Sequence, residues 1–511
     1  MNAVTLPSRS RLGVDVLAYG LALGIMGDLL LRAAPWGLNF SLWICALMGV
    51  GIWLVRRYQL PVSSDFSWLA LSVVLSAVAF VRRDSRALQL IDMAALVGLL
   101  SLTALATQGG RIRLRGISTY LVATVLASAH AWFGTPRLLF SDSPWGRDAQ
   151  SGGRWKELRA IGLGLLVAAP LLLVFGGLFV SADAEFESLV KSLQIDIPTL
   201  VSHVALTGVI GGLSAGALRG AVMSPPETAG IGERTSSPEL RFTSAITALG
   251  ALDLLFLIFV TLQLRYLFGG AAVIVETTRL TISEYARRGF FELVTASALV
   301  LPVLLVADWA TLVEGPRQRR MFRVLAGALV ALVGVLLVSA LQRMLLYVET
   351  FGLTELRLYT TAFMVWLGGV FVWFTLTVLK DERPRFAFGA LAQALVVMGA
   401  LHFANPDALI ARVNLGRATR TLITGPYTSH PLDAPYLAST LSADAVPVLL
   451  EALPRLPAEE QAVVEDQLRS RWGCGSDRSD WRSWNWSEWR ARTLVAARWA
   501  FSKRGFCGAR M

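Results

Sequence analysis

Charged residues are scarce in this sequence, and long stretches contain none. Only 16% of the 511 residues are charged and 54% are hydrophobic, whereas soluble domains carry about 25% charged residues. This deficit argues against an ordinary soluble protein. It predicts that most of the chain lies in the hydrocarbon of a membrane, where charge is costly.

Lysine is nearly absent, occurring only at Lys156, Lys191, Lys380 and Lys503, so arginine supplies most of the net charge of +11. In a soluble protein this charge would suggest nucleic acid as a partner. Here the arginines cluster at the ends of apolar runs. That placement favours contact with anionic membrane lipids and argues against nucleic acid.

Histidine and cysteine are too few for most metal chemistry. The chain has four histidines and three cysteines, with no H-E-x-x-H motif and no P-loop, so we expect no metal and no cofactor. Cys474 and Cys507 could form a disulfide if the C-terminal region faces an oxidising compartment. In a reducing compartment they would be two free thiols.

No catalytic signature is present either. Residues 212–216 match G-x-S-x-G, but a nucleophile elbow requires a strand before the serine and a helix after it. The context here is one continuous apolar helix. The sequence therefore favours a protein that is not an enzyme.

Apolar runs long enough to cross about 30 Å of hydrocarbon recur along the chain. They predict an all-α, polytopic transmembrane helical bundle of about eleven or twelve spans with a small C-terminal helical extramembrane domain. The runs are 14–33, 38–55, 65–81, 87–107, 157–180, 199–219, 243–268, 290–312, 322–346, 357–379 and 386–404. A weaker run, 116–133, could span or lie in the interface. The expected divisions are N-terminal helices at 1–134, a basic cytoplasmic loop at 135–156, a transmembrane core at 157–404 and a tail at 405–511.

Loop charges predict the orientation. Segment 315–323 contains four arginines and no acid, so it should be cytoplasmic. Counting spans from this segment places the tail outside the cytoplasm. The cluster Arg82, Arg83 and Arg86 contradicts this scheme in the first third of the chain.

The most polar membrane segment is 243–292. Glu284, Arg288 and Glu292 share one face if this stretch is helical, and Asp253 lies within an apolar run, where an unpaired charge is costly. A structural ion-pair network that pins two helices is the preferred explanation, and a functional polar site near the outer membrane face is the alternative. The candidate residues are Asp253, Gln263, Arg265, Tyr266, Glu284, Tyr285, Arg288 and Glu292.

Glycines spaced by four follow one predicted span. This spacing places them on one helix face, which lets a second helix approach closely, within the chain or in another copy. The four residues are Gly208, Gly212, Gly216 and Gly220.

Tryptophan is concentrated in the tail. We prefer a small helical domain that uses tryptophan in its core. The alternative is a domain that rests on the membrane or binds a sugar or lipid headgroup, since tryptophan favours the membrane–water boundary. Ser487 is the expected N-cap of a last helix that runs to about Phe501. The six tryptophans are Trp472, Trp481, Trp484, Trp486, Trp489 and Trp499.

Several short runs resemble a bacterial membrane protein family, the domain of unknown function 4173. The runs are QLRYLFGG, TISEYARRGFFEL, SADAEFESL, NPDALIARVNL, LDAPYLASTLSADAVP and DWRSWNWS, spread over roughly residues 160 to 500. The resemblance implies a multi-pass protein of the bacterial inner membrane and no particular chemistry.

Three functional classes therefore remain. A scaffold or sensor is preferred, with membrane lipids as partners and with other proteins or further copies of the chain as potential ones. A permease or transport-accessory protein is the first alternative. A membrane-embedded enzyme or binder of lipid or envelope substrates is the second.

Overall fold

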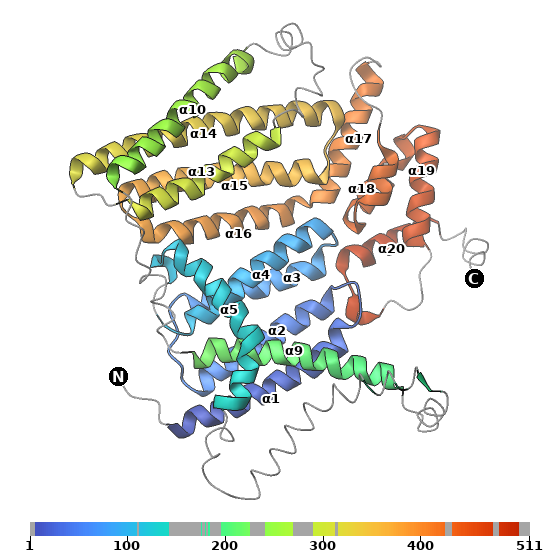
Figure 1. Cartoon of the computed structure of the whole chain (residues 1–511). Helices are drawn as coiled ribbons and strands as arrows, with labels where there is room; N and C mark the ends of the chain where they lie inside the picture. The colour runs from blue at the N-terminus through green and yellow to red at the C-terminus, as the bar shows by residue number, and fades with distance from the viewer. Residues whose placement is uncertain are drawn as a thin grey trace, which may run out of the picture.

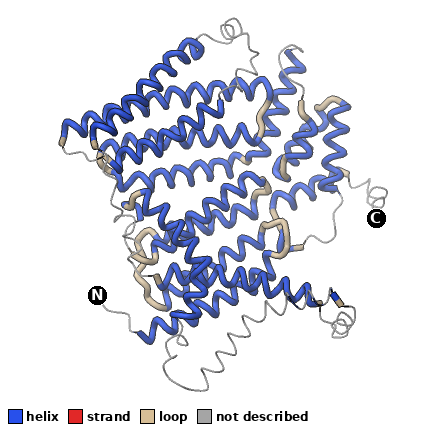
Figure 2. Tube along the Cα trace, viewed as in Figure 1, coloured by secondary structure: helices blue, strands red, loops and turns tan. Residues whose placement is uncertain are grey.

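The computed structural model describes residues 6–109, 112–142, 196–224, 241–268, 290–311, 315–424, 432–473 and 480–499, with a few single positions between 175 and 183. These residues form helices and no β-sheet, as Figure 2 shows. The predicted class, an all-α polytopic helical bundle, is confirmed.

Long apolar helices make up the bundle. Within the described residues, ten are long and apolar enough to cross a membrane, and α3 is a shorter apolar helix, so the chain is a multi-pass membrane protein. The predicted run 157–180 lies outside the described residues. The helices are α1 (Leu6–Leu31), α2 (Leu38–Arg57), α3 (Phe66–Arg82), α4 (Arg86–Ala106), α5 (Ile117–Arg137), α9 (Ile197–Met223), α10 (Phe242–Phe268), α13 (Phe290–Ala310), α14 (Pro316–Phe351), α15 (Glu355–Thr377) and α16 (Phe386–Ala404).

Shorter helices form a tail domain with a core of its own. They are α17 (Pro406–Thr424), α18 (Val446–Ala452), α19 (Ala458–Leu468) and α20 (Trp486–Arg498). The core includes Leu437, Leu441, Leu449 and Leu468, all buried. In Figure 1 this domain sits against one end of the bundle. We call that end of the bundle the tail side and the opposite end the far side.

Tryptophan forms only a minor part of the core of the tail domain, where Trp472 belongs to the core and Trp499 packs against it, so the preferred prediction is confirmed for these two residues alone. Trp472 is buried, but Trp481, Trp484, Trp486 and Trp489 are exposed. The reason is that leucine and alanine side chains of the short helices already fill the interior of the tail domain. Three of the exposed rings, Trp484, Trp486 and Trp489, lie together at the start of α20, where the Trp486 and Trp489 centroids are 5.1 Å apart.

Asn485, not Ser487, caps α20. The Asn485 side chain accepts hydrogen bonds from the backbone N–H groups of Ser487 and Glu488. Its amide nitrogen donates to the carbonyls of Phe80 and Arg83, at 2.8 and 2.9 Å. Asparagine can do both because its amide has an acceptor and a donor. The cap therefore also attaches α20 to the tail-side end of α3. The helix ends at Arg498, three residues before the predicted end.

Helix α5 starts and ends on the far side. Ile117 follows the far-side end of α4, and Asp142, just beyond α5, bonds Arg219 near the far-side end of α9 at 2.6 Å. A Cβ added to Gly13, near the start of α1, would lie 3.2 Å from the Asp142 carbonyl oxygen. The weaker predicted run 116–133 therefore lies obliquely in the far half of the bundle and does not cross it.

Glycine allows α9 to pack closely against two helices. A Cβ on Gly216 would meet backbone oxygens of α5, and one on Gly220 would lie 2.6 Å from the His130 Cβ. A Cβ on Gly208 or Gly212 would meet nothing within 4 Å. Gly211, which was not predicted, faces α1. The two faces of α9 thus pack against α1 and α5, and join these two N-terminal helices to each other.

Candidate functional site

Three of the eight predicted polar residues have side chains that the structure describes. Gln263 is buried in α10 and accepts a hydrogen bond from Ser339 at 3.0 Å. Glu292 is exposed in the first turn of α13. The carboxyl oxygens of Asp253 are buried and have no hydrogen-bond partner in the described part of the chain. Among the described side chains, no hydrogen bond or ion pair joins these three residues to one another, and the predicted polar site stays a prediction.

Five of the predicted polar residues are not placed. Glu284, Tyr285 and Arg288 lie outside the described residues, as do Cys474 and Cys507 of the expected disulfide. For Arg265 and Tyr266 the helix is described but the side chains are not. Within the described ranges, no group of three or more histidine, cysteine or acidic side chains could hold a metal ion.

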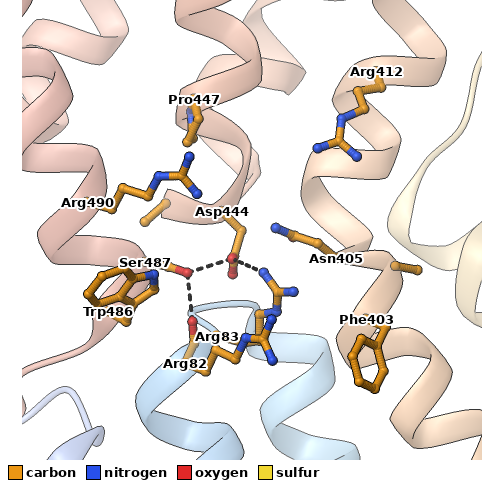
Figure 3. Close-up of a pocket in the computed structure, with 12 residues that line it drawn as sticks. Arg82, Arg83, Phe403, Asn405, Arg412, Asp444, Pro447, Trp486, Ser487 and Arg490 are labelled. Carbon is orange, nitrogen blue, oxygen red and sulfur yellow. Dashed lines mark hydrogen bonds and ion pairs between the residues drawn. The ribbon is translucent and has the colours of Figure 1, made fainter.

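A basic pocket lies where the tail domain meets the bundle. Its volume is about 230 Å³. Figure 3 shows side chains from the end of α3, the end of α16 and the tail helices around it. The lining residues are Arg82, Arg83, Phe403, Ala404, Asn405, Arg412, Ala443, Asp444, Pro447, Trp486, Ser487 and Arg490.

Asp444 forms one wall of the pocket and joins three segments. Its Oδ1 accepts from Arg83 Nη1 at 3.0 Å and lies 2.6 Å from the Ser487 hydroxyl. Its Oδ2 accepts from the backbone N–H of Asp84 at 2.9 Å. The carboxylate is buried, so these bonds replace the water it loses. Asp444 thus connects the loop after α3 to the tail domain.

Three further arginines of the pocket have no acid partner among the described residues. They are Arg82, Arg412 and Arg490, and all three are exposed. The Arg82 guanidinium lies 6.0 Å from the centre of the Phe403 ring. In Figure 3 the guanidinium groups of Arg412 and Arg490 point into the space between the tail helices. With Arg83 and Asp444 neutralising each other, the pocket carries an excess of positive charge.

A histidine–aspartate pair lies next to the pocket inside the bundle. His402 Nε2 is 2.9 Å from Asp92 Oδ1, and both side chains are largely buried. The carbonyl oxygen of His402 accepts from Arg83 Nε at 3.1 Å. Arg83 therefore links the pocket to an ionisable pair on α4 and α16.

Several carboxyl groups lie near Asp444, at the contact between the bundle and the tail domain. Asp84 accepts from the backbone N–H of Ala443 at 3.1 Å. Burial, together with the nearby carboxyl groups of Asp444, Glu488 and Asp407, raises the pKa of Asp84 to about 7. Burial also raises the pKa of Asp407 above its ordinary value. The contact between bundle and tail therefore contains groups that titrate above the usual range for carboxyl groups.

The pocket was not predicted from the sequence, although two signals pointed to it. The arginines at 82 and 83 did not fit the orientation expected from loop charges. Three of the runs behind the family resemblance, NPDALIARVNL, LDAPYLASTLSADAVP and DWRSWNWS, contribute Asn405, Arg412, Asp444, Trp486 and Ser487 to the pocket.

A family model described as a domain of unknown function, DUF4153, matches residues 70–452. The chain belongs to this family. The match covers about three quarters of the sequence, and the model numbered 4173 is not matched. A few short runs carry less information than a pattern over three quarters of the chain, which is why they gave the wrong family number.

The DUF4153 match includes all the pocket residues except those of α20. No curated protein and no solved structure matches the chain. The pocket itself is therefore the feature of this DUF4153 protein that bears on its function.

Proposed function

We propose that this protein is a sensor-like binding protein of the bacterial inner membrane that recognises an anionic ligand in the basic pocket. The observation that supports this is the convergence of Arg82, Arg412 and Arg490 on one cavity without acid partners in the described residues. A sensor needs a ligand site at a contact that can change. The pocket lies at the contact between the bundle and the tail domain, where a bound ligand would act on both.

The chemistry of arginine favours an oxyanion. Its planar guanidinium forms paired hydrogen bonds with carboxylate and phosphate groups, and charge-assisted bonds of this kind are about twice as strong as neutral ones. Three like charges around one cavity repel one another when it holds only water. An anion would relieve that repulsion, so binding should stabilise the contact between Arg82 of the bundle and the two tail arginines.

The distribution of charge supports an external tail. The far side carries the arginine-rich segment 315–323 and the residues Lys380, Arg383 and Arg385. Basic loops favour the cytoplasmic face. The tail domain and its pocket would then face away from the cytoplasm.

Thermal unfolding of the full chain in neutral detergent tests anion binding. We expect inorganic phosphate to raise the Tm relative to chloride at equal ionic strength, since a ligand that binds the folded state stabilises it. The double substitution Arg412→Gln with Arg490→Gln should abolish the phosphate effect. The matched control is Arg320→Gln, which changes an exposed arginine on the far side. Equal Tm values in phosphate and chloride for the unaltered protein would contradict the proposal.

Transport coupled to protons is the second candidate, on the evidence of the buried Asp92–His402 pair. Ionisable pairs inside membranes often belong to proton pathways. The test is proton movement into proteoliposomes under a phosphate gradient. A flux that Asp92→Asn abolishes would favour transport, whereas no flux from intact protein would favour the binding role.

A further inference from the structure

Aromatic side chains at the edge of the pocket are unusually exposed. Phe403 is 81% exposed and Trp486 is 46% exposed. Both line the cavity, and Trp484 and Trp489 extend the same aromatic surface. Aromatic rings with this exposure are typical of the boundary between hydrocarbon and headgroups.

The pocket also lies at the end of two apolar surfaces of the bundle. Leu71, Leu75 and Val78 on α3 are exposed and are spaced by three or four residues, so they share one helix face. The next position on that face is Arg82. In a multi-pass membrane protein such a face contacts lipid chains, so the arginine stands where those chains end and headgroups begin.

Helix α16 repeats this arrangement. Val396 and Phe403 are both exposed and are seven residues apart, which also places them on one face. The lipid-facing surfaces of α3 and α16 thus both end at residues that line the pocket. A lipid whose chains lie along either surface would have its headgroup at the arginines.

Size and charge restrict which headgroup fits. The volume of about 230 Å³ is below the roughly 300–1,000 Å³ of sites that enclose drug-sized ligands. It suits a phosphate with at most a small substituent. A phosphate monoester carries about −1.5 to −2 charges at pH 7. Arg82, Arg412 and Arg490 have no acid partner in the described part of the chain, and a phosphate monoester would therefore offset more of their charge than a singly charged phosphodiester would.

We propose that the ligand of the pocket is the phosphate monoester group of a membrane lipid, which enters from the lipid phase between α3 and α16. This inference rests on the proposed anion-binding function and adds the class of ligand and its route. Arg82, Arg412 and Arg490 bind the phosphate oxygens. Phe403 and Trp486 contact the lipid where its chains meet the headgroup.

Native mass spectrometry of the full chain in detergent can test this by titration with three probes. The probes are phosphatidic acid, phosphatidylglycerol with the same chains, and soluble glycerol 3-phosphate. We expect phosphatidic acid to bind at least about tenfold more tightly than either of the others. Relative to phosphatidylglycerol, this corresponds to one more charge-assisted hydrogen bond. Relative to glycerol 3-phosphate, it corresponds to the burial of one segment of a lipid chain. Arg412→Gln with Arg490→Gln should remove this preference, and Arg320→Gln should keep it.

A second variant tests the lipid chains separately from the phosphate. Phe403→Ala should weaken the binding of phosphatidic acid and leave that of glycerol 3-phosphate unchanged, because only the lipid has chains to contact the ring. Equal binding of phosphatidic acid and glycerol 3-phosphate by intact protein would overturn the lipid inference and leave anion binding standing. Binding of none of the three probes would overturn both.

Discussion

At the residue scale, the carboxylate of Asp444 is one of the groups that hold the tail domain to the bundle. Arg83, the Asp84 backbone and Ser487 all bond to it, and both it and Arg83 are buried. Removing one member of a buried ion pair leaves the other charge uncompensated, which costs about 3–5 kcal/mol.

Substitution of Asp444 should therefore destabilise the protein. We expect Asp444→Ala to lower the free energy of unfolding by about 3–5 kcal/mol, measured by denaturant unfolding in detergent. Asp444→Asn should lower it less, because it keeps an acceptor oxygen. The control is Glu451→Ala at an exposed site of α18, expected within about 0.5 kcal/mol of the unaltered protein. A similar small effect for Asp444→Ala would show that this carboxylate does not hold the tail.

Asp84 makes the same contact sensitive to pH. Its pKa is about 7 in the folded protein and about 3.9 in an unfolded chain, so between these values the folded state holds a proton that the unfolded state has lost. The stabilisation from this proton is complete below about pH 4 and is lost as the pH rises through about 7.

Asp84→Asn, which cannot lose a proton, should flatten this dependence. We expect the variant to unfold at a higher temperature than the unaltered protein at pH 8, and at a similar temperature at pH 4.5. Thermal unfolding across this range measures the difference between the two proteins. Asp407, whose pKa is also raised, still titrates in both proteins, so the curve of the variant should flatten in part and not completely. Parallel curves for the two proteins would contradict the role of Asp84.

At the element scale, α9 depends on glycine only where another helix touches it. Gly216 faces α5 so closely that a Cβ would lie 2.5 Å from the His130 carbonyl oxygen, whereas Gly208 has nothing within 4 Å. The periodic spacing located the glycines on one face. It could not show which of them face a neighbouring helix, because that depends on where α5 crosses.

Two alanine substitutions on α9 should therefore differ. Gly216→Ala should destabilise the protein by about 1–3 kcal/mol through overpacking, whereas Gly208→Ala should be neutral or slightly stabilising, since alanine favours helix. Thermal unfolding of both variants in the same detergent gives the comparison. Equal Tm values for the two would mean that α5 and α9 are not in close contact at Gly216.

At the scale of the whole molecule, the arginines that conflicted with the expected orientation acquire a different explanation. Arg83 pairs with Asp444 of the tail, and Arg82 lines the pocket. These charges therefore serve the contact between bundle and tail, and they need not mark a cytoplasmic loop. Because α5 starts and ends on the far side, it does not change the side of the bundle on which the chain continues. The start of α1 and the segment 315–323 both lie on the far side.

A reporter fused to the C-terminus tests the resulting topology. We expect alkaline phosphatase to be active there, because this enzyme matures outside the cytoplasm and the tail should lie there too. A fusion after Arg320 is the matched control and should be inactive. The reverse pattern would place the tail and its pocket in the cytoplasm.

Most of the bundle could be predicted from the sequence, because the hydrophobicity of a membrane span is the sum over neighbouring residues. A run such as 322–346 is long enough to cross hydrocarbon whatever surrounds it, and α14 contains it. The solvent exposure of the tail tryptophans could not be predicted in this way; the exposed ones are Trp481, Trp484, Trp486 and Trp489. The sequence shows where tryptophans gather, and only packing decides whether leucine and alanine have already filled the core beside them.

The sequence by itself determined that this chain is a helical membrane protein with a basic character, since apolar length and arginine content are properties of contiguous segments and of composition. The tertiary structure alone decided that residues near 82, 405, 444 and 487 meet in one pocket. The physical reason is that a binding site depends on contacts between segments hundreds of residues apart. No local pattern specifies which ends of which helices will meet.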